Sequence, residues 1–175
     1  MASPCSAFSG PVTGEDILLI PEAAARLMEM LDDSAWAKDL SPEDVKTLTG
    51  YLTLRCYACG ETVFREGDVD ERYLAIILKG AVEISKTETH EDVGSRFIIK
   101  MGPGRAFGEM ALIEGAPRSA TAVTCEETWL LLLTEASLER ICARDGKLGM
   151  TLLRNIARLL SFRLRHTSER LLNAI

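Results

Sequence analysis

The sequence RAFGEMALIEGAPRSATA, at residues 105–122, is the stretch on which the interpretation of the whole chain depends. Gly108 precedes a segment, Glu109–Ile113, that is long enough for about one helical turn, and the first N–H groups of a helix favour an anion. Arg118 carries a forked, permanent positive charge that suits phosphate oxygens, and Ser119 adds a hydroxyl donor. Glu109 has the wrong charge for phosphate but is a good acceptor for sugar hydroxyls. These residue types predict a ribose-phosphate site; the alternative is that Glu109 and Arg118 pair with each other in an ordinary turn.

Short strand-like runs separated by turns surround this stretch. Glycines at positions 60, 67 and 80 and the sequence Gly-Pro-Gly at 102–104 mark the turns. Strands are expected over Tyr51–Cys56, Thr62–Arg65, Tyr73–Leu78, Ala81–Lys86, Arg96–Met101, Ser119–Thr124 and Thr128–Leu133. Strands this short and closely spaced predict a mainly β fold, an antiparallel jelly-roll β-barrel, rather than alternating strands and helices.

Helical patterns occupy both ends of the chain. Helices are expected over Glu15–Leu31, Pro42–Gly50, a short segment after Thr134, and a long segment from near Asp145 to about Leu172. The second of these has a clear start, because Ser41 can cap it and Asp44 can accept a hydrogen bond in return as the acid of a capping box. The predicted organisation is a flexible tail at 1–14, N-terminal helices at 15–50, the β-barrel at 51–133 and C-terminal helices at 134–175.

The composition of the 175 residues is that of an ordinary globular protein, with 47% hydrophobic and 26% charged residues and a net charge of −6. The charge is uneven, since residues 143–175 carry seven Lys/Arg and two Asp/Glu, whereas the rest of the chain carries 13 and 24. An acidic chain is a poor candidate for direct nucleic-acid binding. The basic end can cap an anionic ligand, attract an acidic partner, or contact the acidic body of a second copy.

Several function classes are disfavoured by what the sequence lacks. No apolar run approaches the roughly 20 residues of a membrane span, and no basic residue precedes Arg26 as a secretory signal would require. We therefore expect a cytoplasmic protein with reduced thiols. Cys56 and Cys59 form a lone CxxC without partners for zinc, and only His90 and His166 are present, so no metal site is expected. Neither histidine has a GxSxG-like context, and we predict no enzymatic activity.

The sequence from Phe107 to Ile113, followed by Ala116–Ala120, resembles the phosphate-binding cassette of cyclic nucleotide-binding domains. This family includes bacterial catabolite-activator-type regulators, cyclic-nucleotide-dependent kinases and gated channels. Upstream, Gly60–Asp68 and Tyr73–Val82 are similar to the early strands of the family, and roughly 130 residues from Leu40 onward can be aligned with it. The resemblance implies a jelly-roll barrel that binds a cyclic nucleotide.

The resemblance also implies a role for individual residues. Gly108 and Glu109 would contact the ribose 2′-OH, while Arg118 and Ser119 would hold the cyclic phosphate. The backbone N–H groups of Met110 and Ala111 would lie nearby, and apolar contacts to the sugar and base would come from Val82, Ile98 and Met101. Family members that favour cGMP often have threonine directly after the arginine, so Ser119 favours cAMP.

In the family, the long helix that follows the barrel commonly covers the base. Thr167 and Ser168 resemble the Thr-Ser pair that bacterial members use against adenine, although about four extra residues separate them from the expected position. Arg163 and Arg165 are rival caps, and the alternative is that all four are solvated surface residues. The apolar stripe Leu148, Leu152, Ile156 and Leu159 can form a dimer seam or pack on its own barrel. The resemblance favours the homodimer.

These observations predict a regulatory module that signals to an effector protein, as yet unknown, through helix movement. The chain ends at Ile175 without a winged helix-turn-helix, so we expect a stand-alone module with no direct nucleic-acid contact. One alternative is a degenerate domain that mediates dimerisation or docking without a nucleotide. The other is a site for a cyclic dinucleotide held by extra arginines such as Arg163 and Arg165.

Overall fold

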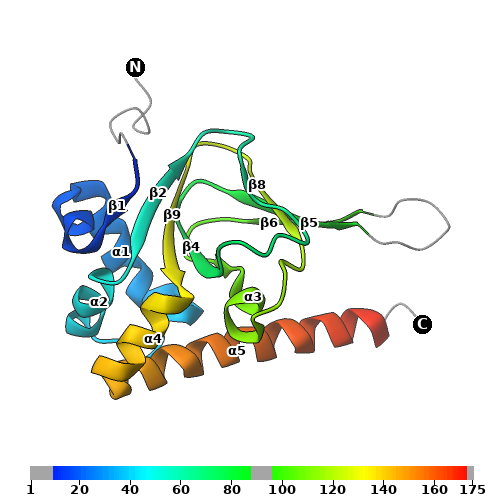
Figure 1. The fold of residues 1–175 in the computed structure, drawn as a ribbon. Coiled ribbons are helices and arrows are strands. Elements are labelled where there is room, and N and C mark those ends of the chain that lie inside the picture. Colours follow the sequence, from blue (N-terminus) through cyan, green and yellow to red (C-terminus); the bar gives the residue numbers. More distant parts are fainter. Residues whose placement is uncertain (1–9, 88–95, 173–175) are drawn as a thin grey trace.

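Two antiparallel sheets form the body of the protein, and helices cover one side of it (Figure 1). The computed structural model describes residues 10–87 and 96–172. One sheet has the strand order β1-β2-β9-β4-β7 and the other has the order β3-β8-β5-β6. The strands are β1 (Val12–Thr13), β2 (Thr53–Tyr57), β3 (Thr62–Phe64), β4 (Tyr73–Lys79), β5 (Val82–Thr87), β6 (Arg96–Met101), β7 (Ala106–Phe107), β8 (Thr121–Thr124) and β9 (Thr128–Thr134). This is the predicted jelly-roll architecture.

The central strands β4 and β9 are buried on both faces. They pair antiparallel, with Ile76 opposite Leu131, and alternate residues belong to different apolar clusters. Ala75 and Ile77 face the interior between the two sheets, and Ile76 faces the helices. These two strands therefore connect the interior of the barrel with the helical layer, which explains why both read as continuous apolar runs.

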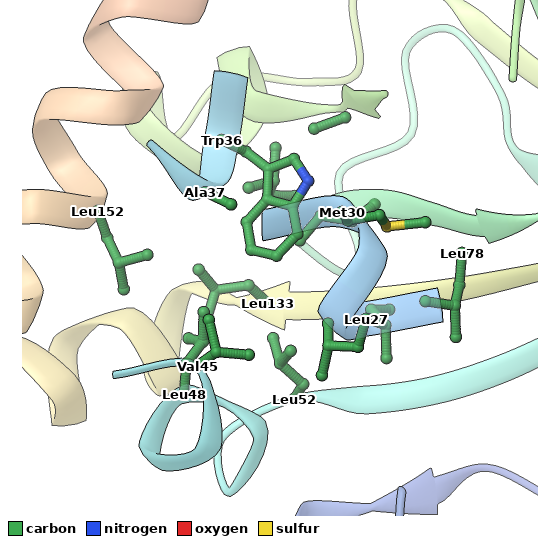
Figure 2. Packing of buried hydrophobic residues seen from close by; sticks show 14 of the residues in the cluster. Leu27, Met30, Trp36, Ala37, Val45, Leu48, Leu52, Leu78, Leu133 and Leu152 are labelled. Atoms are coloured by element: carbon green, nitrogen blue, oxygen red, sulfur yellow. The ribbon is translucent and has the colours of Figure 1, made fainter. Parts of the chain in front are cut away.

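The helical layer packs on the outer face of the larger sheet. It contains the 3₁₀ segments η2 (Gly14–Leu19) and η3 (Ala35–Ala37) and the helices α1 (Pro21–Asp33), α2 (Pro42–Thr49), α4 (Glu135–Arg144) and α5 (Gly146–Leu172). Figure 2 shows Trp36 at the centre of this layer, near Met30 and Leu133, with Leu152 reaching in from α5. The long helix is thereby anchored to the N-terminal helices through its first half.

The predicted capping box at the start of α2 is confirmed. The Asp44 backbone N–H donates to Ser41 Oγ over 3.1 Å, and the Ser41 N–H donates to Asp44 Oδ2 over 2.9 Å. Hydrogen bonds from the Ser41 side chain and backbone lower the pKa of the Asp44 carboxyl.

Several local expectations need correction. In place of the expected single helix over Glu15–Leu31, the structure has a 3₁₀ segment followed by a helix that begins only at Pro21. Proline fits the first turn of a helix, but inside a helix it cannot donate the backbone hydrogen bond that the preceding turn requires. Val12–Thr13 pair with β2 instead of belonging to a tail. The two-residue strand β7 was not expected, because it is too short to show a periodicity.

Cys56 is disulfide-bonded, whereas Cys59, Cys125 and Cys142 are free thiols. The expectation of reduced thiols throughout is therefore wrong for Cys56. The other member of the CxxC pair, Cys59, is a free thiol, so the two cysteines are not joined to each other. His90 and residues 1–9 of the expected tail lie outside the described residues.

Candidate functional site

The site begins at Gly108, which joins β7 to the short helix α3 (Glu109–Glu114). Strand β7 pairs with β4 through Phe107 and Ala75, and this fixes where the chain turns. Gly108 has φ +81°, a left-handed conformation that glycine adopts without strain. A Cβ at this position would lie 2.7 Å from Arg118 Nη1 and 2.9 Å from the Tyr73 carbonyl oxygen. Glycine is therefore required both by the backbone and by the close approach of Arg118.

Arg118 is a buried cation, with only 4% of its surface exposed. Its guanidinium donates to the carbonyl oxygens of Tyr73 (3.0 Å), Gly108 (3.2 Å) and Glu71 (2.7 Å). The guanidinium carbon also lies 4.2 Å from the ring centroids of both Phe64 and Tyr73. Burial lowers the pKa of Arg118. It is thus a positive charge held in place by neutral groups, the arrangement that a bound anion would complete.

Burial also raises the pKa of the Tyr73 hydroxyl, to about 12. This hydroxyl donates to the Val63 carbonyl oxygen over 3.2 Å, which fixes the ring against the guanidinium of Arg118. Tyr73 is consequently neutral near pH 7 and supports Arg118 through its ring and backbone rather than by charge.

Glu109 is almost fully buried, with 1% of its surface exposed, and it does not pair with Arg118. Its Oε1 accepts a hydrogen bond from Arg163 Nη1 of α5, and Arg163 Nη2 donates to the Ala106 carbonyl oxygen. Its Oε2 has no hydrogen-bond partner among the described residues. The interpretation of Glu109 and Arg118 as a simple ion pair is therefore wrong. A buried carboxylate oxygen without a donor is expected to receive one from a ligand.

These groups surround a cavity of about 70 Å³. Its lining residues are Phe64, Ile84, Met101, Phe107, Gly108, Glu109, Met110, Ala111, Arg118, Ser119, Ala120 and Arg163. Typical small-molecule sites occupy roughly 300–1,000 Å³. A nucleotide can therefore enter only if the lining moves, and Arg163 is the lining residue that the described part of α5 supplies.

Two of the three residues expected to make apolar contacts lie elsewhere. Met101 lines the cavity, whereas Val82, directly opposite it on β5, is buried in the barrel interior. Ile98 is 50% exposed and stands three positions from Met101, so it points to the other face of β6. Ile84, which lines the cavity, was missed. The two-residue period of β5 could have identified Ile84, which lies two positions from Val82 and therefore on the same face of the sheet.

Of the four residues suggested to cover the base, only Arg163 borders the cavity. Arg165, Thr167 and Ser168 are exposed. The hydroxyls of Thr167 and Ser168 donate, each over 2.9 Å, to the carbonyl oxygens of Arg163 and Leu164 one turn earlier in the helix. The Thr-Ser pair therefore faces solvent and bonds to its own helix.

The apolar stripe expected as a dimer seam belongs to the core. Leu148, Leu152 and Ile156 are each at most 4% exposed and pack within the helical layer. Three exposed apolar residues of α5 lie on another face: Met150 (61%), Leu153 (43%) and Leu164 (69%). With Ala157 and Leu160 between them, these positions alternate in steps of three and four, the spacing of a coiled-coil seam.

Within residues 10–87 and 96–172, no three His, Cys, Asp or Glu side chains are grouped so that they could hold a metal ion. Among the same residues, no helix is long and apolar enough to cross a membrane.

Comparison with known proteins identifies similar sequences. A family model described as "Cyclic nucleotide-binding domain" matches residues 54–145. The Cyclic AMP receptor protein of Thermus thermophilus is 35% identical over 126 residues, covering 72% of this chain and 55% of that protein. A CRP-like cAMP-activated global transcriptional regulator of Mycobacterium tuberculosis is 30% identical over 147 residues, covering 84% of this chain and 62% of that protein. The chain thus spans less than two thirds of the length of either relative.

Solved structures agree on the fold. A cyclic nucleotide-binding domain from Methylobacillus flagellatus superimposes with a TM-score of 0.78 at 26% sequence identity, covering 100% of this chain and 97% of that chain. The Thermus thermophilus Catabolite Activator Protein superimposes with a TM-score of 0.69 at 32% identity, covering 79% of this chain and 62% of that chain.

Proposed function

Because this chain belongs to the cyclic nucleotide-binding domain family, we propose that it is a regulatory module that binds a cyclic nucleotide in the cavity beside Gly108. The proposal rests on two buried charged groups at the same cavity, each of which lacks a partner that a ligand could supply. Among the described residues, the Arg118 guanidinium donates its hydrogen bonds to neutral carbonyl oxygens, and Glu109 Oε2 is an acceptor without a donor. A cyclic phosphate next to a ribose hydroxyl supplies what each group lacks.

The nucleotide that we propose is cAMP. Ser119 follows the arginine where members that favour cGMP often have threonine, and its exposed hydroxyl stands at the edge of the cavity. The names of two similar proteins, one from Thermus thermophilus and one from Mycobacterium tuberculosis, also refer to cAMP. The proposed preference for cAMP rests on Ser119 and on those relatives.

We further propose that binding is transmitted to α5 through Arg163. This side chain links α5 to Glu109, the residue that the ribose hydroxyl would contact. A ligand can shift the equilibrium between two positions of α5 only by as much as its binding free energy differs between those positions. Arg163 can provide such a difference, because it lines the cavity and joins α5 to Glu109. An effector protein, or a second copy bound along the exposed stripe of α5, would read the new helix position.

A ligand panel tests the proposal. Thermal unfolding is followed with cAMP, cGMP and cyclic dinucleotides, and the affinity of any stabilising ligand is then measured by calorimetry. A ligand at 100 times its Kd stabilises the folded state by about 2.7 kcal/mol, which is easily detected. We expect cAMP to give the largest shift.

Two variants locate the binding groups. Arg118→Lys keeps the charge but loses the planar fork, and Glu109→Gln keeps the shape but loses the negative charge. Each should weaken cAMP binding about 100-fold, the loss of one charge-assisted contact of about 3 kcal/mol. Arg65→Gln is the matched control, because Arg65 is exposed and does not line the cavity. No response to any nucleotide would instead support the docking module without a ligand.

A further inference from the structure

A second and much larger cavity lies beside the candidate nucleotide site. Its volume is about 840 Å³, and its walls come from three distant parts of the chain. These are the end of α1 with η3, the end of β6 with the turn at 102–105, and the second half of α5. It shares only Met101 and Arg163 with the smaller cavity. The proposed nucleotide function makes no use of it.

The charged groups around this cavity are mainly positive. Among the side chains that the structure describes, the cations Arg26, Lys100, Arg105 and Arg163 line it, together with one carboxylate, Glu29. Arg26 pairs with Glu22 and Arg163 with Glu109. Lys100 and Arg105 make no ion pair with any described residue, and both are exposed. The potential at the rim therefore favours an anion.

The inner wall offers apolar surface and one buried donor. Met30, Ile99 and Phe162 contribute to the lining, and Ile99 and Phe162 are 38% and 61% exposed. Trp36 also lines the cavity and lies beside Met30 (Figure 2). Trp36 is 4% exposed, yet its indole Nε1–H has no hydrogen-bond partner in the part of the chain that the structure describes. A buried indole N–H normally finds an acceptor.

We propose that this cavity binds a small organic anion with an apolar body. The anionic head, a carboxylate, sulfonate or phosphate, lies at Arg105 and Lys100. The apolar part packs against Met30, Ile99 and Phe162, and an acceptor on the ligand takes the Trp36 N–H. The volume lies within the roughly 300–1,000 Å³ of small-molecule sites. The cavity shares Arg163 with the nucleotide site, so its occupant contacts the same helix that the nucleotide would move.

Fluorescence titration with 8-anilino-1-naphthalenesulfonate tests the proposal on the full chain without any nucleotide. We expect one saturable site per chain. The neutral parent compound, N-phenyl-1-naphthylamine, has the same ring system and no sulfonate, and it should bind at least about tenfold more weakly. Equal binding of the two compounds would overturn the assignment of an anion site.

Variants then place the probe in this cavity. Arg105→Gln should weaken the sulfonate by about tenfold, the value of one charge-assisted contact. Trp36→Phe keeps an aromatic ring and removes the N–H, and it should also weaken the probe. The matched controls are Arg65→Gln and Trp129→Phe, because neither residue lines the cavity. Circular dichroism checks that each variant is folded. An affinity that is unchanged in both test variants, or lowered equally in the controls, would overturn the proposal.

Displacement experiments identify the apolar body and separate this site from the nucleotide site. Release of the probe by dodecanoate indicates an aliphatic acid, and release by 1-naphthyl phosphate indicates an aromatic one; either supports the proposal. If cAMP alone releases the probe, with one cAMP bound for each probe molecule released, the proposal is overturned, because the cavity would then be part of the nucleotide site. Arg105 and Trp36 do not line the cassette cavity, so failure here leaves the proposed nucleotide function intact.

Discussion

Gly108 is constrained both by its backbone conformation and by the atoms that surround it. The backbone adopts φ +81°, and the space that a Cβ would need is taken by Arg118 Nη1 and by the Tyr73 carbonyl oxygen. The same guanidinium donates to the Gly108 carbonyl oxygen, so the glycine both admits Arg118 and helps to hold it. The position of the buried cation therefore depends on the absence of one methyl group.

Gly108→Ala should destabilise the protein and weaken nucleotide binding together. Gly60→Ala is a matched control, because Gly60 also has φ +81° but no atom lies within 4 Å of its added Cβ. The control should cost about 1–2 kcal/mol for the left-handed backbone alone. Gly108→Ala should cost about 1–3 kcal/mol more from the steric overlap. Urea unfolding measures both variants, and equal losses would show that Arg118 does not restrain this position.

Helix α5 consists of two halves that are held differently. The first half is buried through Leu148, Leu152 and Ile156. It is also fixed by Asn155, whose side-chain amide donates to the carbonyl oxygens of Trp36 (2.9 Å) and Lys38 (2.6 Å). In the second half, Arg163 supplies the described side-chain hydrogen bonds to the barrel. The second half is therefore the part that a ligand can release.

Removing the Arg163 side chain should loosen the second half of α5. In Arg163→Ala without ligand, the amides of residues 164–169 should exchange with deuterium about tenfold faster, the effect of losing about 1.4 kcal/mol of local stability. Exchange in residues 148–156 should stay unchanged, because their packing does not involve Arg163. Mass spectrometry after proteolysis measures both regions.

Arg165→Ala is the control for this experiment. Arg165 is exposed, and it lines neither cavity. The same acceleration in both variants would show that exchange reports general fraying of the helix, and would exclude Arg163 as the link to the site.

Considered as a whole, the molecule is an acidic barrel with a basic final helix, and part of that charge difference is neutralised within the chain. Arg158 pairs with Asp39 over 2.7 Å, and Arg163 pairs with Glu109. The basic helix thus contacts the acidic body of its own chain. What α5 leaves exposed is the apolar face that contains Met150, Leu153 and Leu164, and we proposed a second copy as one reader of this face.

Replacing Leu164 by glutamate should dissociate such a dimer. A charge within a coiled-coil seam is unfavourable because it would be buried without a partner. Sedimentation velocity should show a dimer for the unchanged protein and a monomer for Leu164→Glu. Val69→Glu is the control, since Val69 is 62% exposed and lies outside α5. A monomer in all three samples would contradict the proposed seam.

The features predictable from the sequence depend on neighbours along the chain. The capping box joins Ser41 and Asp44, three positions apart, and the glycine turns separate strands whose limits fall within two residues of the expected ones. The sequence around Gly108, Glu109 and Arg118 also predicted a ribose-phosphate type of site, and the structure brings these three residues to one cavity. Such signals are local, because hydrogen bonds, backbone preferences and side-chain periods act over a few residues.

The tertiary structure decided which of these distant parts of the chain contact one another. The sequence by itself determined the class of fold, the cassette and the existence of a long C-terminal helix. It could not show that Glu109 would pair with Arg163, 54 positions away, rather than with Arg118. Nor could it show which apolar stripe of α5 would be buried, because the helix carries two such stripes. Both outcomes depend on how α5 packs against η3 and α3, and packing between distant segments leaves no periodic signal in either of them.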